Sequence, residues 1–154
     1  MGKIKVTQKC RAPIDRVYST ARDPRAFIGD MPNIKDIDII EQSADGCFSK
    51  AEWILDIKLP IKHGKLSWIQ EIEWLDGDRR CRFRLSSDYE GIVKKMEGVI
   101  DFKPAGDCTQ MDLELDFLVK HPLVSSTVQG IFDGIMRKNN EGLLKGIRRK
   151  AEKS

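Results

Sequence analysis

A long helical segment near the C-terminus constrains the fold more than any other feature of this chain. Between about Pro122 and Glu152, apolar side chains recur three and four residues apart, which predicts an amphipathic helix. The stripe consists of Val128, Ile131, Phe132, Ile135, Asn139 and Leu143. The same segment contains Gly130, Gly134, Gly142 and Gly146, and each interior glycine costs roughly 1 kcal/mol relative to alanine. A long helix laid across a curved sheet, with room between the two, explains both features.

The rest of the chain predicts seven antiparallel strands. Residues 3–10 alternate between apolar and polar side chains, Ala12-Pro13 begins a short helix, and a second short helical piece covers 25–28. Three hairpins follow, with strands at 34–42 and 48–57, 64–74 and 79–87, and 93–103 and 109–120. We therefore expect an α+β fold whose apolar sheet face is covered by the C-terminal helix.

Complementary charges predict the order of the strands. The first strand presents Lys3, Lys5 and Lys9 on its outer face. The last strand presents an acidic row on the same face, consisting of Asp112, Glu114 and Asp116. Opposite charges across neighbouring strands are stabilising, so we expect these two strands to pair. If the other strands form a meander, the sheet order is 1-7-6-5-4-3-2.

The dipeptide Asp76-Gly77 predicts a tight hairpin turn. If it forms a two-residue turn, Glu73 lies opposite Arg80 and Glu71 opposite Arg82 on the outer face. This register also directs Ile72, Phe83 and the other apolar residues of both strands toward the helix.

Composition excludes several classes of protein. The 154 residues suit one domain, and 27 basic against 24 acidic residues give a net charge of +3, too even a balance for a nucleic-acid-binding chain. No segment approaches the ~20 apolar residues of a membrane span, and the N-terminus shows no signal region, so we expect a cytoplasmic protein. The four cysteines are widely spaced and predict free thiols, and two histidines without metal-ligand spacing predict no metal site and no cofactor.

Three stretches resemble one known superfamily. The opening KIKVTQKCRAPIDRVYSTARDPRAF, the second strand MPNIKDIDIIE and the closing LDFLVKHPLVSSTVQGIFDGIMRKNNEGLLKGIRRKAE resemble the SRPBCC superfamily, also called START or birch-pollen-allergen-like. The resemblance covers essentially the whole chain and is closest to the polyketide cyclase/dehydrase and ubiquinone-binding START branch. It implies a single START-like domain with the helix-grip fold.

The resemblance also implies a hydrophobic cavity between sheet and helix that binds a lipid, a quinone or a polyketide-like molecule. Two alternatives stay open. A polyketide cyclase or dehydratase-type enzyme requires a perturbed acid or base in the cavity, and the inward polar candidates Tyr18, Gln70 and Asn139 are few. A protein-interaction module similar to ribosome-associated START proteins would show a collapsed cavity and an exposed apolar patch.

The inner surfaces of sheet and helix supply the candidate ligand-binding residues, and we assign no catalytic residue. We expect a pocket that approaches the ~300–1,000 Å³ of small-molecule sites. The candidates are Trp53, Leu55, Trp68, Gln70, Phe83, Leu85, Met96, Leu115, Phe117, Phe132, Ile135 and Asn139.

Loop topology predicts a rim at one end of the sheet. Alternate turns of an antiparallel meander share an end, which gathers Tyr89, His121, Lys62, Lys94, Lys95 and Lys120. Such a basic rim suits an anionic head group or a transient contact with a membrane surface, and solvated loops are the simpler interpretation.

Overall fold

The computed structural model describes residues 2–59, 62–88, 92–119 and 126–153, with the backbone alone for 57–59 and 62–65. One seven-stranded sheet, a long helix and short helical segments make up this structure. In chain order the elements are β1 (Gly2–Cys10), α1 (Ile14–Thr20), the 3-10 helix η1 (Pro24–Asp30), β2 (Ile34–Gln42), β3 (Phe48–Leu59), β4 (Lys62–Leu75), the 3-10 turn η2 (Asp76–Asp78), β5 (Arg80–Ser87), β6 (Val93–Ala105), β7 (Cys108–Val119) and α2 (Ser126–Lys153).

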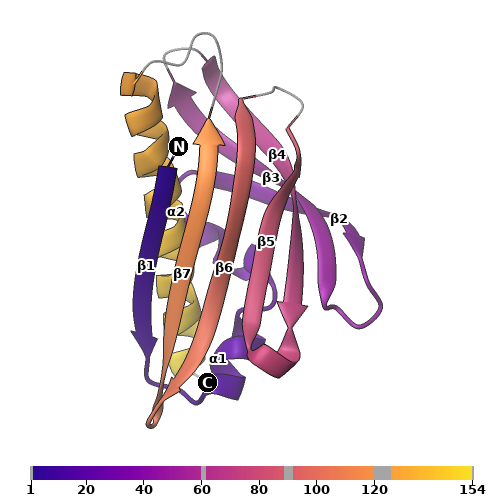
Figure 1. Ribbon diagram of the computed structural model, residues 1–154, viewed down its shortest axis with the longest axis vertical. Coiled ribbons are helices and arrows are strands. Elements are labelled where there is room, and N and C mark those ends of the chain that lie inside the picture. The colour runs from indigo at the N-terminus through magenta and orange to yellow at the C-terminus, as the bar shows by residue number, and fades with distance from the viewer. Residues whose placement is uncertain (1, 60–61, 89–91, 120–125, 154) are drawn as a thin grey trace.

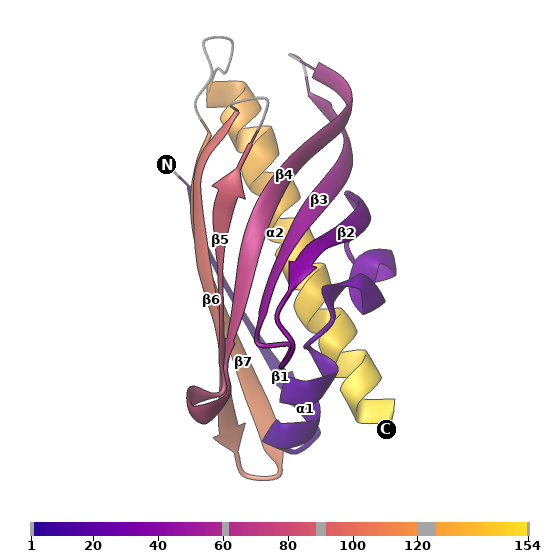
Figure 2. The same cartoon turned by 90° about the vertical axis from the view of Figure 1, so that its right-hand side faces the viewer.

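The sheet has the predicted order, β1-β7-β6-β5-β4-β3-β2, with every neighbouring pair antiparallel. It curves along its length, and α2 runs across its inner side, with α1 near one end (Figures 1 and 2). The short helix η1 packs on α2 and β2. This arrangement is the helix-grip fold. Buried apolar side chains from the inner sheet face, α1, η1 and α2 form a single core.

The predicted charge pairing of the first and last strands is confirmed. Lys3 lies opposite Asp116, and Lys5 lies opposite Glu114 with 3.5 Å between Nζ and Oε1. Further along, the Thr7 hydroxyl donates to Asp112 Oδ1 over 2.9 Å. These pairs are exposed and contribute little energy each, but they specify which strand closes the sheet.

The predicted register between β4 and β5 is wrong by two residues. Glu73 lies opposite Arg82, and Glu71 lies opposite Arg84. The turn is longer than two residues, because η2 covers Asp76–Asp78 and Arg79 follows in the left-handed conformation with φ of 50°. A shift of two residues preserves the faces of both strands, so the inward set of side chains is unchanged.

Helix α2 buries a stripe slightly rotated from the predicted one. Val128, Phe132 and Asn139 are buried as expected, whereas Ile131 is 38% exposed and Ile135 is half-buried. The stripe continues through residues that the prediction omitted, namely Met136, Leu144, Ile147 and Ala151.

The glycines of α2 fall into two classes. A Cβ at Gly130 or Gly134 would meet no atom within 4 Å. At Gly142 it would overlap the backbone carbonyl of Asp30, and at Gly146 it would crowd Phe27 and the Asp30 carboxylate. The second pair therefore lets η1 approach the helix closely, and this contact fixes the position of α2 relative to η1.

Candidate functional site

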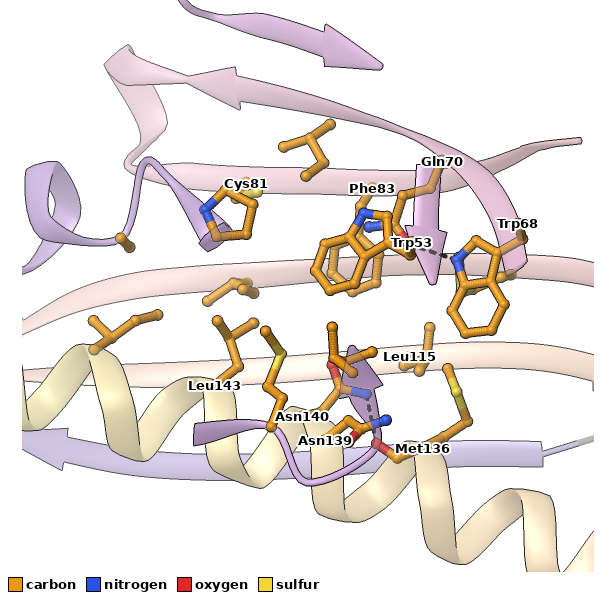
Figure 3. Close-up of a pocket in the computed structure, with 18 of the residues that line it drawn as sticks. Trp53, Trp68, Gln70, Cys81, Phe83, Leu115, Met136, Asn139, Asn140 and Leu143 are labelled. Carbon is orange, nitrogen blue, oxygen red and sulfur yellow. Dashed lines mark hydrogen bonds between the residues drawn. The ribbon is translucent and has the colours of Figure 1, made fainter. Parts of the chain in front are cut away.

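A cavity of about 60 Å³ lies between the sheet and α2. The helix packs on β1 and β7 at one edge of the sheet and also on α1 and η1. The middle strands of the sheet contribute Trp53, Trp68, Gln70 and Phe83 to the cavity wall. From the opposite side, α2 contributes Met136, Asn139, Asn140 and Leu143 (Figure 3).

Seven of the twelve predicted residues line this cavity. They are Trp53, Trp68, Gln70, Phe83, Met96, Leu115 and Asn139. Trp53 and Trp68 are opposite each other on β3 and β4, and both are buried. The two indoles therefore form one wall of the cavity from the sheet side.

The other five predicted residues do not line it. Phe117 and Phe132 pack against each other with ring centroids 5.8 Å apart and ring planes inclined by 50°, and the Phe117 ring also covers Gly2. These rings fill the space between α2 and the β1–β7 edge. Leu55 is fully buried in the core, and Leu85 and Ile135 are half-buried against it. The filled edge leaves space only toward the middle of the sheet, and the cavity falls below the predicted ~300–1,000 Å³.

Besides the sheet residues Ile34, Ile72, Trp74, Cys81 and Ile100, two groups of lining residues were missing from the prediction. On α2 the wall includes Met136, Asn140 and Ile147. A helical period continued in both directions from Leu143 would have found them. The other group closes the end of the cavity and includes Ala21, Pro24 and Met31. These come from the short helical segments, whose position depends on tertiary packing that no local pattern encodes.

Three polar groups were candidates for contact with a ligand, and two have local partners. The Tyr18 hydroxyl donates to Asp76 Oδ1 over 2.7 Å, outside the cavity lining. Gln70 Oε1 accepts from Trp68 Nε1 over 2.9 Å. Asn139 Oδ1 accepts from the backbone N–H of Asn33 over 3.1 Å, but its Nδ2 has no partner. Trp53 Nε1 is likewise buried without a partner.

The described lining residues carry no formal charge. The one ionisable group among them is the thiol of Cys81, and burial raises its pKa, which keeps it protonated and a poor nucleophile. Among the residues that the structure describes, no cluster of ligating side chains could hold a metal ion. None of the helices described is long and apolar enough to cross a bilayer.

A second hollow, of about 480 Å³, lies on the outer face of the sheet. Its lining includes Glu71, Glu73, Arg82 and Arg84, and Arg84 Nε pairs with Glu71 Oε2 over 2.8 Å. A surface of paired and hydrated charges does not suit an apolar molecule.

The predicted rim falls largely outside the described residues. Tyr89, Lys120 and His121 lie beyond them, as does the side chain of Lys62. Lys94 is exposed and Lys95 half-buried at the start of β6. The rim stays a prediction.

Solved structures share this fold over nearly the whole chain. TTHA0849 from Thermus thermophilus is 22% identical with a TM-score of 0.81, and the match covers 97% of each chain. The Zhui aromatase/cyclase from Streptomyces sp. R1128 is 16% identical with a TM-score of 0.81, over 99% of this chain and 94% of that one. A START superfamily protein from Mycobacterium smegmatis is 20% identical with a TM-score of 0.72, over 98% and 97%.

These similarities confirm the fold expected from the resemblance to START proteins. No protein-family model matches the sequence, and no curated protein matches it.

Proposed function

We propose that this protein binds a small hydrophobic molecule between the sheet and α2. The observation that carries the proposal is the uncharged cavity lined by Trp53, Trp68 and Phe83 from the sheet and by Leu143 and Met136 from the helix. Burial of an apolar ligand against these side chains supplies affinity at roughly 25 cal/mol per Å². The helix-grip proteins of similar structure, which include an aromatase/cyclase, support the same general kind of function.

The volume of the cavity requires an adaptable wall. A water molecule needs roughly 10–15 Å³ of such volume, so about 60 Å³ holds a few waters or a very small ligand. Three of the lining residues, Met31, Met96 and Met136, are unbranched and can change rotamer at low cost. We infer that a larger ligand gains its space by moving these methionines rather than by moving the sheet.

The described wall favours binding over catalysis. Acid–base chemistry needs a titratable group in contact with the substrate, and the protonated Cys81 thiol is the one such group in the described lining. Nor do the described residues present a continuous apolar patch for a protein partner. Their large exposed hydrophobic side chains are Ile40 on β2 and Ile131 on α2, on separate elements.

Native mass spectrometry of the purified protein tests the proposal. We expect a retained apolar molecule whose mass is lost after extraction with organic solvent. The variant Leu143→Phe should reduce retention because it fills the cavity. Its matched control is Ile131→Phe, which makes the same kind of change at an exposed position of α2. Retention that is the same in both variants, or absent from the wild-type protein and not restored by added apolar compounds, would contradict the proposal.

A further inference from the structure

Two nitrogen atoms distinguish the cavity wall from the rest of the interior. Among the described residues, Trp53 Nε1 and Asn139 Nδ2 are the buried side-chain polar atoms that lack a hydrogen-bond partner. Both residues line the cavity, and their exposed fractions are 7% and 5%. An unpaired buried donor costs about 1–3 kcal/mol, so one on the sheet side and one on the helix side of the same cavity indicate a partner that occupies it.

The orientation of the Asn139 amide is determined by its neighbour. The backbone N–H of Asn33 can only donate, and the Asn139 atom that it contacts at 3.1 Å must therefore be the oxygen. The nitrogen of the same amide is then the unpaired atom. Because an indole N–H also only donates, both unpaired groups require an acceptor.

Two of the three side-chain amide oxygens in the lining already accept a hydrogen bond, and the third belongs to Asn140. Gln70 Oε1 accepts from Trp68 Nε1, and Asn139 Oδ1 accepts from Asn33. A ligand hydroxyl would bring a proton that needs its own acceptor, whereas a carbonyl oxygen accepts and requires nothing in return. A carboxylate would be buried without a cation, because the described lining carries no charged side chain.

We propose that the cavity selects an uncharged, flat apolar molecule that presents a carbonyl oxygen to Trp53 Nε1 on the sheet side and a second acceptor oxygen to Asn139 Nδ2 on the helix side. The indoles of Trp53 and Trp68 and the ring of Phe83 supply flat surfaces for its apolar part, and the two donors fix its orientation. The inference rests on the proposed function, because it assigns the ligand chemistry of the same cavity.

Acetophenone, ethylbenzene and benzoate test the inference as probes of closely similar shape. Binding is followed in nitrogen–proton correlation spectra, where the three tryptophans give three indole signals and Trp53→Phe identifies that of Trp53. Hydrophobicity alone favours ethylbenzene. A carbonyl that pairs with Trp53 Nε1 reverses the order, and we expect acetophenone to bind about two- to tenfold more tightly than ethylbenzene. Acetophenone should move the Trp53 indole proton signal downfield, ethylbenzene should not, and benzoate should not compete.

Variants separate the hydrogen bond from the packing. Trp53→Phe keeps an aromatic ring without the N–H and should reduce the preference for acetophenone over ethylbenzene to one or below. Trp68→Phe makes the same change where the N–H already has a partner. In Trp68→Phe the affinities for acetophenone and ethylbenzene should change together. The preference for acetophenone over ethylbenzene should therefore stay at or above the wild-type value.

The outcomes distinguish the two proposals. Equal binding of acetophenone and ethylbenzene, tight binding of benzoate, or an unmoved Trp53 signal would overturn the carbonyl inference and leave a cavity for apolar molecules. In that case water satisfies the two donors. Failure of all three probes, together with no retained molecule in native mass spectrometry, would overturn the proposed function and the inference with it.

Discussion

Gly142 of α2 lies directly against the backbone carbonyl of Asp30, the last residue of η1. The contact leaves no space for a Cβ, and a backbone carbonyl cannot swing aside as a side chain can. Two turns further along, Arg149 pairs with the Asp30 carboxylate. Together these contacts hold the helix that carries Asn139 and Leu143 at a fixed distance from η1, which also packs on β2.

Replacement of Gly142 by alanine should therefore destabilise the protein. We expect a loss of about 1–3 kcal/mol in the free energy of unfolding, because the added methyl group must displace backbone. Gly134→Ala is the matched control, since a Cβ there meets no atom within 4 Å and alanine favours the helix by up to about 1 kcal/mol. Urea unfolding measures both. Equal effects of the two substitutions would show that helix propensity, and not contact with η1, governs position 142.

The sheet order could be predicted because it depends on local patterns. Alternation fixes which side chains share a face, and the lysines of β1 match the acidic row of β7. The β4–β5 register could not be predicted in this way. Asp76 is held by Tyr18 and Arg22 of the α1 segment, and this tertiary contact accompanies a turn longer than two residues.

The cavity was predicted in position but not in extent. The sequence identifies Trp53, Trp68 and Asn139 as inward-facing, and the alternation of the strands accounts for this success. It does not reveal that the rings of Phe117 and Phe132 pack together and fill one edge, because the rotamers of two aromatic rings on different elements depend on the packed interior. Nor does it place Met31, which depends on how η1 approaches α2.

Acid unfolding should depend on the contact between Tyr18 and Asp76. The hydrogen bond from Tyr18, with the charge of Arg22 nearby, holds the pKa of the Asp76 carboxyl below its ordinary value. Since the folded pKa is below the unfolded one, the stabilisation is present above about pH 3.9 and is lost as the pH falls further. In the variants Tyr18→Phe and Asp76→Asn, the free energy of unfolding should therefore depend less steeply on pH in this range.

Urea unfolding between about pH 2 and pH 6 measures this effect. Asp78→Asn is the control, because Asp78 is exposed in the same turn. If the slope of stability against pH is the same for Asp76→Asn as for the wild-type protein, the Tyr18 contact does not contribute to acid stability.

Asn139→Asp should show the opposite dependence on pH. Aspartate retains an oxygen for the Asn33 N–H but places a carboxyl in an uncharged wall. Desolvation raises the pKa of such a group by about one to three units, so stability is retained at low pH and lost as the pH rises above about 3.9. The loss at neutral pH should be about 1.4–4 kcal/mol. Asn140→Asp is the control, and it should lose less free energy of unfolding at neutral pH because position 140 is half-buried. Equal losses in the two variants, measured by urea unfolding, would indicate that position 139 is hydrated.

The adaptability of the cavity should depend on its three methionines. Replacement of Met31, Met96 and Met136 by leucine conserves volume, so each change should cost less than about 1.5 kcal/mol in stability. Leucine is branched and has fewer rotatable bonds, so the wall should open less readily. We expect unchanged affinity for acetophenone and weaker binding of acetylpyrene, a larger flat ketone, measured by titration of the indole signals. Met111→Leu is the control, because Met111 is fully buried but does not line the cavity. If acetylpyrene binds the triple variant as tightly as the wild-type protein, space for a large ligand comes from movement of the backbone instead.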